Sequence, residues 1–524
     1  MKKIKARPGV LVVLDGWGIG KKDKEINAIE AAKTPFFDKV FKKFPSTQLD
    51  ATGEAVGLEK NQMSGSEAGH LNIGAGRVVD QDVRIILEEI SSGSFFYNPA
   101  FLSTINKVKQ RGTNIHLMGL MGNSDSPHSH PDIFFALLIL LKKHGLENRV
   151  YLHLFTDGRD SYPKSAKEHW HKWKKGIERI GAGELASVCG RFYAMDRIKK
   201  WERLEQAYNA LVEGEGHQAD DFEEAIDKQY KRGLTDEYIE PIIFKKSGKA
   251  SPRINHGDGV IFFNFRSDRA RQFSKLFVGR QGPDARFFQD DVKKLKNLAF
   301  VALSNFGPDL ELTTAYFNPP VKNTLPVSLS NLRQLYIAET EKFAHITYFI
   351  NGGYSDSVGG EERVMINSPE LKSYANKPEM AAYEVADVVV KNLKAGAYDF
   401  YAINFANADM LGHTGDFQAT KKGVEAVDKQ LKKIYKEVKR KKGFLLITAD
   451  HGNADQMLSD DKKRSFTFHT KNPVPLILAS PEKELKKIKF ASKGKLASVA
   501  PTLLNLLGAK KPRQMKEESL IKKH

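Results

Sequence analysis

Several short apolar runs in this 524-residue chain stop at an acidic residue or at a histidine. The clearest are residues 9–14, 401–405 and 444–449, and a shorter run covers residues 466–468. Apolar runs of this length are typical of buried strands in a parallel sheet, and the side chains that follow such strands meet at one edge. The polar residues that follow these runs, and that we expect to lie together, are Asp15, Asp409, His413, Asp450, His451 and His469.

Three aspartates and three histidines at one sheet edge predict a site for two adjacent divalent metal ions. Carboxylates and imidazoles together suit Mn²⁺, Mg²⁺ or Zn²⁺, and the mixed set favours Mn²⁺ or Zn²⁺ over Mg²⁺ alone. Taken singly, the motifs have simpler explanations, because Asp409 and His413 could be a pair on a surface helix and Asp15-Gly16 could be a turn. The prediction therefore depends on all of them acting together.

Strand and helix patterns alternate along nearly the whole chain, which is typical of an α/β fold with a doubly wound, mostly parallel sheet. Further strands are expected at residues 114–118, 149–155, 185–189, 260–265, 298–303, 345–350 and 474–479. Helices are expected at residues 134–143, 165–180, 198–212, 220–230, 380–393, 420–441 and 497–507.

The expected metal ligands are divided between the N-terminal end and the last third of the chain. A domain that contains all of them must therefore be discontinuous. We predict a metal domain made of residues 1–79 and 317–524, with a second α/β domain inserted at residues 80–316. Two domains also suit the length of the chain, which is long for a single hydrophobic core.

Composition and charge limit the kinds of molecule that this protein is expected to bind. The formal net charge of +18 suggests nucleic acid, but the lysines lie in helical stretches such as residues 432–442 and no aromatic-plus-basic motif accompanies them. We expect no nucleic-acid partner, since a positive field also attracts a small polyanionic substrate. The longest apolar run, residues 133–141, is shorter than the roughly 20 residues that cross a bilayer, so no membrane partner is expected. The single cysteine, Cys189, fits a reducing cytoplasm.

A serine-containing turn at residues 63–70 supplies a candidate nucleophile, Ser66. Glycines around it, and again at residues 74–76, permit tight backbone geometry. A serine hydroxyl beside a divalent metal loses its proton far more readily than a free one. On its own the segment could be a flexible Gly/Ser loop, and the nucleophile hypothesis depends on the neighbouring metal site.

Arginines gather after three of the expected strands of the middle segment, at residues 157–160, 190–197 and 264–269. Guanidinium groups bind carboxylate and phosphate through paired hydrogen bonds, so three such clusters indicate an anionic substrate. Asp160 lies among these cations, which should keep it ionised and able to exchange a proton with a hydroxyl. The candidate substrate residues are His128, Arg159, Asp160, Arg191, Arg197, Arg266 and Arg269.

These motifs resemble those of the cofactor-independent, or 2,3-bisphosphoglycerate-independent, phosphoglycerate mutases of the alkaline phosphatase superfamily. The resemblance extends from residues 12–18 to residues 469–475, with landmarks at 69–77, 337–342, 377–380 and 448–455. It implies an alkaline-phosphatase-like metal domain and an inserted transferase-like substrate domain. It also implies a monomer in the cytoplasm that acts on phosphoglycerates.

The resemblance also implies roles for single residues. One metal would be bound by Asp409, His413 and His469, and the other by Asp15, Ser66, Asp450 and His451. Ser66 would become a phosphoserine, with Asp160 and Lys342 as further catalytic residues. Lys342 would also join His128, Asp160 and the five arginines in binding the substrate. The two ions are expected to be Mn²⁺, with Mg²⁺, Zn²⁺ or Co²⁺ as alternatives, and no bisphosphoglycerate is required.

Two segments depart from the family pattern. The family usually has Gly-Asn-Ser at the nucleophile, whereas this chain has Ser64-Gly65-Ser66, and the spacing to Glu67 and His70 favours Ser66. Residues 122–127, before His128, are one residue longer than the family segment. The implied reaction converts 3-phosphoglycerate into 2-phosphoglycerate. The alternatives are a metal-dependent phosphatase or phosphopentose mutase, which would lack the arginine clusters, and a basic binding protein, which would have no use for the metal ligands.

Overall fold

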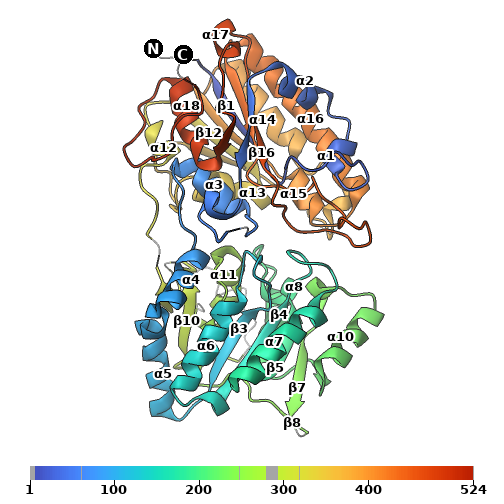
Figure 1. Cartoon of the computed structure of the whole chain (residues 1–524), viewed down its shortest axis with the longest axis vertical. Coiled ribbons are helices and arrows are strands. Elements are labelled where there is room, and N and C mark those ends of the chain that lie inside the picture. Colours follow the sequence, from blue (N-terminus) through green and yellow to red (C-terminus); the bar gives the residue numbers. More distant parts are fainter. Residues whose placement is uncertain are drawn as a thin grey trace. The chain divides into compact units, whose positions relative to one another are not determined.

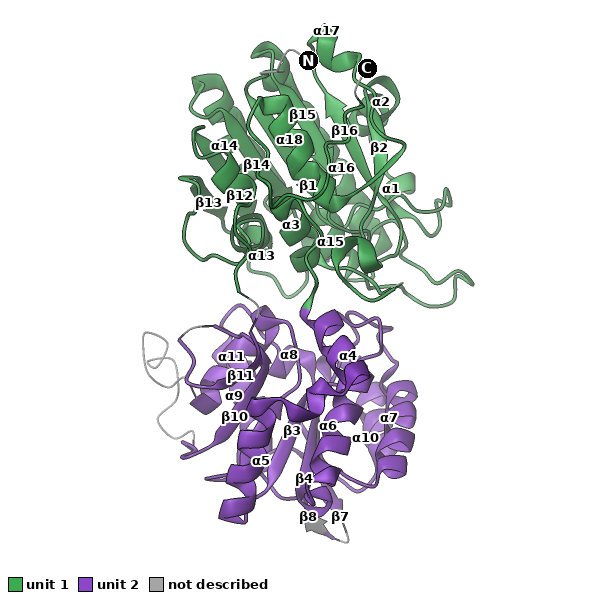
Figure 2. Cartoon of the chain, turned by 60° about the vertical axis from the view of Figure 1, so that its left-hand side comes forward, with its two compact units in different colours: residues 1–81, 319–524 green, residues 82–318 purple. Residues whose placement is uncertain are grey.

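The computed structural model describes residues 6–60, 62–246, 248–278, 293–307, 309–317 and 319–522. The chain divides into two compact units, which Figure 2 shows in green and purple. Unit 1 contains residues 1–81 and 319–524, and unit 2 contains residues 82–318. The predicted domain boundaries, after residues 79 and 316, fall two residues before the boundaries of the units at 81 and 318.

Unit 1 is built on an eight-stranded sheet, counted over the described residues, in the order β13-β12-β14-β1-β15-β16-β2-β17. The strands from β13 to β15 are parallel to one another, and β16 is antiparallel to its two neighbours. Because β1 lies between β14 and β15, every one of its residues is buried, which explains its continuous apolar sequence. The strands are β1 (Gly9–Leu14), β2 (Ser46–Asp50), β12 (Gln334–Glu339), β13 (Glu362–Ile366), β14 (Phe400–Phe405), β15 (Phe444–Thr448), β16 (Val474–Ala479) and β17 (Lys493–Lys495).

Helices cover both faces of this sheet (Figure 1). One layer contains α1 (Ala28–Ala31), α2 (Pro35–Lys43), α14 (Ala382–Ala395) and α16 (Phe417–Arg440), which pack on one another. The other contains α3 (Ser66–Ala75), α12 (Leu325–Ser328) and α18 (Val499–Leu507). Short helices follow strands at α13 (Thr340–Ala344), α15 (Asn407–Gly412) and α17 (Lys483–Lys486). The sheet and its two helix layers are the doubly wound architecture that the sequence predicts.

Unit 2 has its own mixed sheet, in the order β11-β10-β9-β3-β4-β5-β7-β6, with β8 paired to β7. The strands from β11 to β5 are parallel, and β7 is antiparallel to β5. The strands are β3 (Ile115–Leu120), β4 (Val150–Thr156), β5 (Glu184–Gly190), β6 (His217–Ala219), β7 (Ile242–Lys246), β8 (Lys249–Ala250), β9 (Gly259–Phe262), β10 (Ala299–Ser304) and β11 (Thr313–Tyr316).

The helices of unit 2 also form two layers. One contains α4 (Asp82–Ser92), α6 (Pro131–Lys143), α7 (Ala166–Ile180) and α10 (Phe222–Lys231), and α5 (Pro99–Arg111) packs on β9, β10 and β11. The other contains α8 (Arg191–Ala194), α9 (Trp201–Val212) and α11 (Ser267–Val278), whose apolar side chains form a buried core with β3, β9 and β10. None of the helices in the described ranges combines the length and the apolar character needed to span a bilayer.

Two predicted strands are wrong. Residues 345–350 form a π-helical turn, His345–Phe349, which continues α13 and packs against α3. A short apolar run cannot be assigned to strand or buried helix by periodicity alone, and the strand of this region is β12, just before α13. Residues 466–468 are not a strand either; they lie in a loop held by isolated bridges from Leu458 to Ser465 and from Gly452 to Thr470. The other predicted strands and helices are confirmed within a few residues at their ends.

A chain of buried polar side chains crosses the sheet of unit 2. Ser187 on β5 donates to Nδ1 of His153 on β4 at 2.8 Å, and His153 Nε2 lies 3.0 Å from Nδ1 of His116 on β3. His116 Nε2 lies 3.2 Å from Oδ2 of Asp258. Since the Asp258 carboxylate accepts, two neutral imidazoles that each donate from Nε2 and accept at Nδ1 satisfy every atom of this chain. Burial lowers the pKa of His116 and lowers that of His153 well below its ordinary value.

We expect unit 2 to lose stability on mild acidification because of these two histidines. Below about pH 6.5 the unfolded chain binds protons that the folded rings do not. A histidine that stays neutral in the folded chain then lowers the free energy of unfolding by at most about 1.4 kcal/mol per pH unit, and His153, whose pKa is lowered further, contributes more than His116. Urea denaturation of the metal-free protein between about pH 7 and about pH 5 measures this slope. His153→Gln should flatten the slope relative to the unaltered chain, and an unchanged slope would contradict the prediction.

Candidate active site

The predicted metal ligands of unit 1 lie at the carboxyl ends of its central strands. Asp15 follows β1, Asp409 lies in α15 directly after β14, and Asp450 and His451 follow β15. The three strands are neighbours and parallel, so these residues emerge at one edge of the sheet. His413 ends α15, and His469 reaches the same place from the loop before β16. All six are buried or nearly so.

Ser66 is the first residue of α3, and its hydroxyl lies among two of these predicted ligands and a lysine. Its Oγ is 3.1 Å from Asp15 Oδ1, 3.0 Å from His451 Nε2 and 2.8 Å from Nζ of Lys342. The side chain is buried, at 4% exposure. A serine at a helix N-terminus, beside a lysine ammonium, is in a position to carry negative charge.

Lys342 connects the serine to the carboxylates. It lies in α13, which follows β12, and its Nζ is 2.6 Å from Asp15 Oδ1 and 2.6 Å from Asp409 Oδ2. Burial opposes its charge, but attraction to Asp15 and Asp409 raises the pKa of Lys342 above its ordinary value. The lysine is therefore a fixed cation in this site, and it keeps both carboxylates in place.

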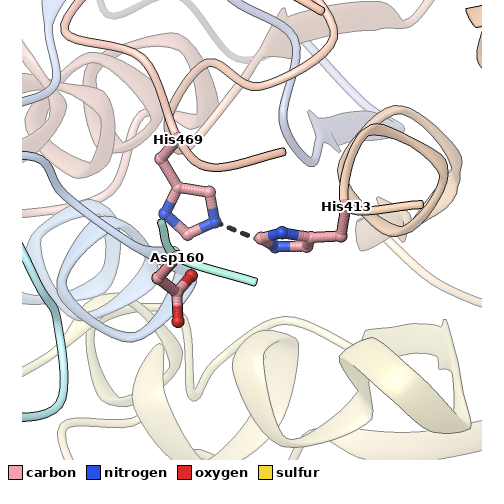
Figure 3. A group of neighbouring side chains, drawn as sticks. All are labelled: Asp160, His413 and His469. Atoms are coloured by element: carbon pink, nitrogen blue, oxygen red, sulfur yellow. Dashed lines mark hydrogen bonds between the residues drawn. The ribbon is translucent and has the colours of Figure 1, made fainter. Parts of the chain in front are cut away.

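His413 and His469 face each other, as Figure 3 shows, with their Nε2 atoms 3.2 Å apart. The Nδ1 atom of His413 lies 2.7 Å from the carbonyl of Thr467, and that of His469 lies 2.6 Å from the carbonyl of Ser64. Each Nδ1 must donate to its carbonyl, so both Nε2 atoms present lone pairs. Asp409 Oδ1 is 3.2 Å from both Nε2 atoms. Three acceptor atoms that converge in this way fit a divalent cation.

A second donor set lies beside the first. His451 Nε2 is 3.4 Å from Asp450 Oδ2 and 3.6 Å from Asp15 Oδ1. Burial lowers the pKa of His451 to about 3, which keeps the imidazole neutral and able to bind a metal. Burial raises the pKa of Asp15 to about 7; the charge of Asp450 adds to the rise and Lys342 opposes it. A cation bound here would offset that rise by stabilising the ionised carboxylates, so these donors also fit a metal.

The candidate ligand atoms form overlapping groups. Those of Asp15, Asp450 and His451 lie within 4.8 Å of one another, and so do those of Asp409, His451 and His469. His451 thus lies between the two predicted ion positions, and its ring stacks on that of His469 with centroids 3.9 Å apart. The structure therefore brings together the eight predicted residues of unit 1: Asp15, Ser66, Lys342, Asp409, His413, Asp450, His451 and His469.

The predicted substrate residues of unit 2 lie at the carboxyl ends of its parallel strands, and Arg191 is their centre. The Nη1 atom of Arg191 donates to Asp157 Oδ1 at 2.6 Å and to Asp160 Oδ2 at 2.5 Å, and its Nη2 atom lies 2.9 Å from His128 Nε2. His128 therefore accepts at Nε2 and carries its hydrogen on Nδ1, a buried atom that has no hydrogen-bond partner among the described residues. The N–H group at Nδ1 of His128 is therefore available to donate a hydrogen bond to a bound anion.

The other arginines surround a second carboxylate, Asp268. Arg197 Nη1 is 3.3 Å and Arg266 Nε is 3.7 Å from it, while Arg269 donates to the carbonyl of Met195 at 3.2 Å. Burial and repulsion from Arg197, Arg159 and Arg191 lower the pKa of Arg269 well below its ordinary value. Cations that repel one another in this way bind an anion strongly. Arg159 lies 3.7 Å from Glu237 and completes the predicted set.

Loss of the Arg191 guanidinium should destabilise unit 2. Arg191→Met would leave Asp157 and Asp160 buried without their cation, and we expect the free energy of unfolding to fall by about 3–5 kcal/mol. Three of the four tryptophans, Trp170, Trp173 and Trp201, lie in unit 2, so tryptophan fluorescence during urea denaturation reports on this unit.

Arg232 offers a matched control for this measurement. It pairs with Glu240 in the same unit, but its side chain is half exposed. Arg232→Met should change the free energy of unfolding by no more than about 1 kcal/mol. Equal effects of the two substitutions would contradict the role assigned to Arg191.

Some residues of the site did not emerge from the sequence. Asn404 contacts Asp15, Asn453 donates to Asp409 Oδ1 at 3.0 Å, and His70 contacts the carbonyl of Ser66. The only signal for Asn404 is an amide within the apolar run 401–405. The main-chain carbonyls of Ser64 and Thr467 orient the imidazoles of His469 and His413. Such contacts cannot be predicted from the sequence, because every residue has a main-chain carbonyl.

Comparison with known proteins places this geometry in a family. A sequence model described as "Metalloenzyme superfamily" matches residues 7–511. A 2,3-bisphosphoglycerate-independent phosphoglycerate mutase of Clostridium perfringens (strain SM101 / Type A) is 44% identical over 520 residues, covering 99% of each chain. One from Clostridium tetani is 43% identical over 518 residues, covering 98% of this chain and 99% of the relative. The crystal structure of Leishmania mexicana phosphoglycerate mutase at low cobalt concentration aligns with a TM-score of 0.90 and 29% identity, covering 100% of this chain and 99% of that one.

The fold and the donor sets are thus those of a metalloenzyme with an alkaline-phosphatase-like α/β architecture. Divalent metal ions are the cofactors of this class. Within it, the chain belongs to the 2,3-bisphosphoglycerate-independent phosphoglycerate mutases, which are isomerases that act on small phosphoglycerates.

Proposed function

We propose that the chain interconverts 3-phosphoglycerate and 2-phosphoglycerate in glycolysis and gluconeogenesis by passing the phosphoryl group through Ser66. The observation that carries this proposal is the position of the Ser66 hydroxyl, which lies within about 3 Å of Asp15, His451 and Lys342. A serine held among a lysine, a carboxylate and a neutral imidazole at a helix N-terminus is suited to attack phosphorus and to carry the phosphoryl group.

We propose two ions at this centre. One would be bound by Asp409, His413 and His469, and the other by Asp15, Ser66, Asp450 and His451. Mn²⁺ is the proposed metal, since carboxylate and imidazole donors suit it, and Mg²⁺, Zn²⁺ and Co²⁺ are the alternatives. When bound, such ions supply positive charge that favours an ionised serine and stabilises the oxygens around phosphorus.

The chain's own residues carry the remaining steps. The arginines of unit 2 and His128 bind the glycerate carboxylate and hydroxyl, while Lys342 neutralises charge on the serine oxygen. The Ser66 hydroxyl gives up its proton to solvent before the first turnover, and its oxygen attacks phosphorus; the bond from phosphorus to the C3 oxygen breaks as the Ser66–phosphorus bond forms. The Asp160 carboxylate then takes the proton of the C2 hydroxyl and passes it to the C3 oxygen, so Asp160 is ionised before and after the transfer. The C2 oxygen attacks phosphoserine and releases the Ser66 oxygen in its ionised form for the next cycle, and no bisphosphoglycerate takes part.

The roles of the two parts of the chain follow from this mechanism. Residues 1–79 and 317–524 form the phosphatase-like metal domain, and residues 80–316 form the transferase-like substrate domain. We propose that the protein works as a monomer in the cytoplasm. A buried, unpaired Cys189 supports a reducing compartment.

The phosphoserine can be detected directly. Protein mixed with 3-phosphoglycerate and Mn²⁺, and quenched in acid during turnover, should yield a peptide phosphorylated at Ser66 by mass spectrometry. An assay coupled to enolase should show the same rate with and without added 2,3-bisphosphoglycerate. Phosphorylation of another residue, or a rate that requires bisphosphoglycerate, would contradict the mechanism.

A further inference from the structure

One buried amide connects the separate parts of the unit 1 site. Asn404 is the fifth residue of β14, opposite Val13 of β1, and is 1% exposed. Its Nδ2 atom donates to Asp15 Oδ2 at 2.8 Å and lies 3.0 Å from Nε2 of His70. Both hydrogens of the amide are therefore used, one on a candidate metal ligand and one on a residue of α3.

His70 carries this connection to the nucleophile. It lies one turn after Ser66 in α3 and is completely buried. Its Nδ1 atom is 2.8 Å from the carbonyl oxygen of Ser66 and 3.3 Å from Asp450 Oδ2. Both of these neighbours accept hydrogen bonds, so Nδ1 donates and Nε2 accepts from Asn404. The hydrogen bonds thus run from Asn404 through His70 to the main chain of Ser66.

We infer that Asn404 and His70 are positioning residues for the phosphoryl transfer. Together they form a brace that fixes the Asp15 carboxylate and the first turn of α3 relative to each other. Displacements of about 1 Å between reacting groups can cost about a hundredfold in rate, so a rigid connection at this point has catalytic value. Neither residue is needed to bind substrate. The inference rests on Ser66 being the nucleophile, as proposed above.

A double-mutant cycle tests the brace. Asn404→Ala and His70→Ala should each lower kcat by about 10- to 100-fold and leave KM for 3-phosphoglycerate nearly unchanged. Because the two residues act in series, the double variant should lose no more than the more damaging single variant. Calorimetric titration of Mn²⁺ into metal-free Asn404→Ala should give binding about tenfold weaker than for the unaltered chain, since Asp15 has lost the amide that holds it.

The Asn404→Leu variant shows whether Asn404 acts through its hydrogen bonds or only by filling space in the core. Leucine fills nearly the same volume, so a residue that only fills space would regain activity, whereas the brace predicts the same loss of kcat as with alanine. Gln334→Leu is the matched control. Gln334 is a buried amide at the start of β12, and its Nε2 atom donates only to the carbonyls of Pro326 and Gly359. It should leave kcat unchanged.

The results that overturn the brace are distinct from those that overturn the proposed function. The brace fails if folded Asn404→Leu keeps kcat within about threefold of the unaltered chain, or if the two single losses multiply in the double variant. If alanine variants are recovered unfolded, Asn404→Leu and His70→Leu replace them in the same cycle. Full activity of Ser66→Ala would instead refute the assignment of Ser66 as the nucleophile, independently of the result of the double-mutant cycle.

Discussion

Replacing Ser66 by alanine is expected to lower kcat by at least about 10⁴-fold, because among the described residues no other hydroxyl is hydrogen-bonded to Lys342, Asp15 and His451. The fold should persist, since Lys342 keeps its bonds to Asp15 and Asp409 when the hydroxyl is removed. The enolase-coupled assay measures the loss, and circular dichroism shows whether the variant is folded. The phosphorylated peptide should disappear together with the activity.

Ser64 provides a control two residues away. It is as buried as Ser66, at 1% exposure, but within the described part of the chain its hydroxyl makes a single hydrogen bond, to the carbonyl of Gly65 at 3.4 Å. Its main-chain carbonyl, which orients His469, is kept in Ser64→Ala. This variant should retain most of its activity and its phosphopeptide. An inactive Ser64→Ala beside an active Ser66→Ala would move the nucleophile to Ser64 and require a different geometry for the site.

Removal of divalent metal should abolish activity without unfolding the chain. Without the divalent ion, burial raises the pKa of the Asp15 carboxyl to about 7 although Lys342 opposes the rise, so the carboxyl is partly protonated at neutral pH. Ser66 then lacks the positive charge of the metal that favours its ionised form. We expect EDTA to lower the rate by at least about 10³-fold. Unit 1 should stay folded because Lys342 compensates Asp15 and Asp409. The assay and a thermal denaturation curve, recorded on the same sample, test both statements.

Re-addition of ions completes this experiment. Mn²⁺ should restore activity and raise the melting temperature, because an ion that binds only the folded chain stabilises it. Asp409→Asn, which weakens one donor set, should require a higher Mn²⁺ concentration for the same activity. Full activity after dialysis against EDTA, with no metal found by elemental analysis, would contradict a metal-dependent reaction.

The central strands could be predicted because burial on both faces leaves them almost without polar residues. β1, β14 and β15 are continuous apolar runs of this kind. Two of the missed strands bury less: β13 has exposed and half-buried positions, and β17 has only three residues. Another, β12, was missed although all six of its residues are buried, and it carries a polar residue at each end. The error at residues 345–350 has another cause. There an apolar run completes a helix against α3, and only the packing of that helix distinguishes it from a strand.

The candidate ligands could be predicted because carboxylates and imidazoles are rare at the ends of apolar runs. Lys342 was assigned only through the resemblance to a known family, since its helix follows β12, which was not among the predicted strands. The sequence predicted Asn404 only as an interior residue of the strand at 401–405. Its role depends on the register of β14 with β1, which places it beside Asp15, and on the direction of α3, which brings His70 to it. Neither relation is local in the sequence.

The position of β1 in its sheet has a consequence for the order of events on the ribosome. Its two partners are β14 and β15, and β14 begins at Phe400, 386 residues after Leu14 (400 minus 14). At a synthesis rate of about 5–20 residues per second, roughly 20–80 s pass between the synthesis of β1 and that of its first partner strand, β14. Unit 2, which is continuous from residue 82 to 318, can fold during that interval. During synthesis, the apolar strand β1 is thus without either of its sheet partners until the last quarter of the chain has been made.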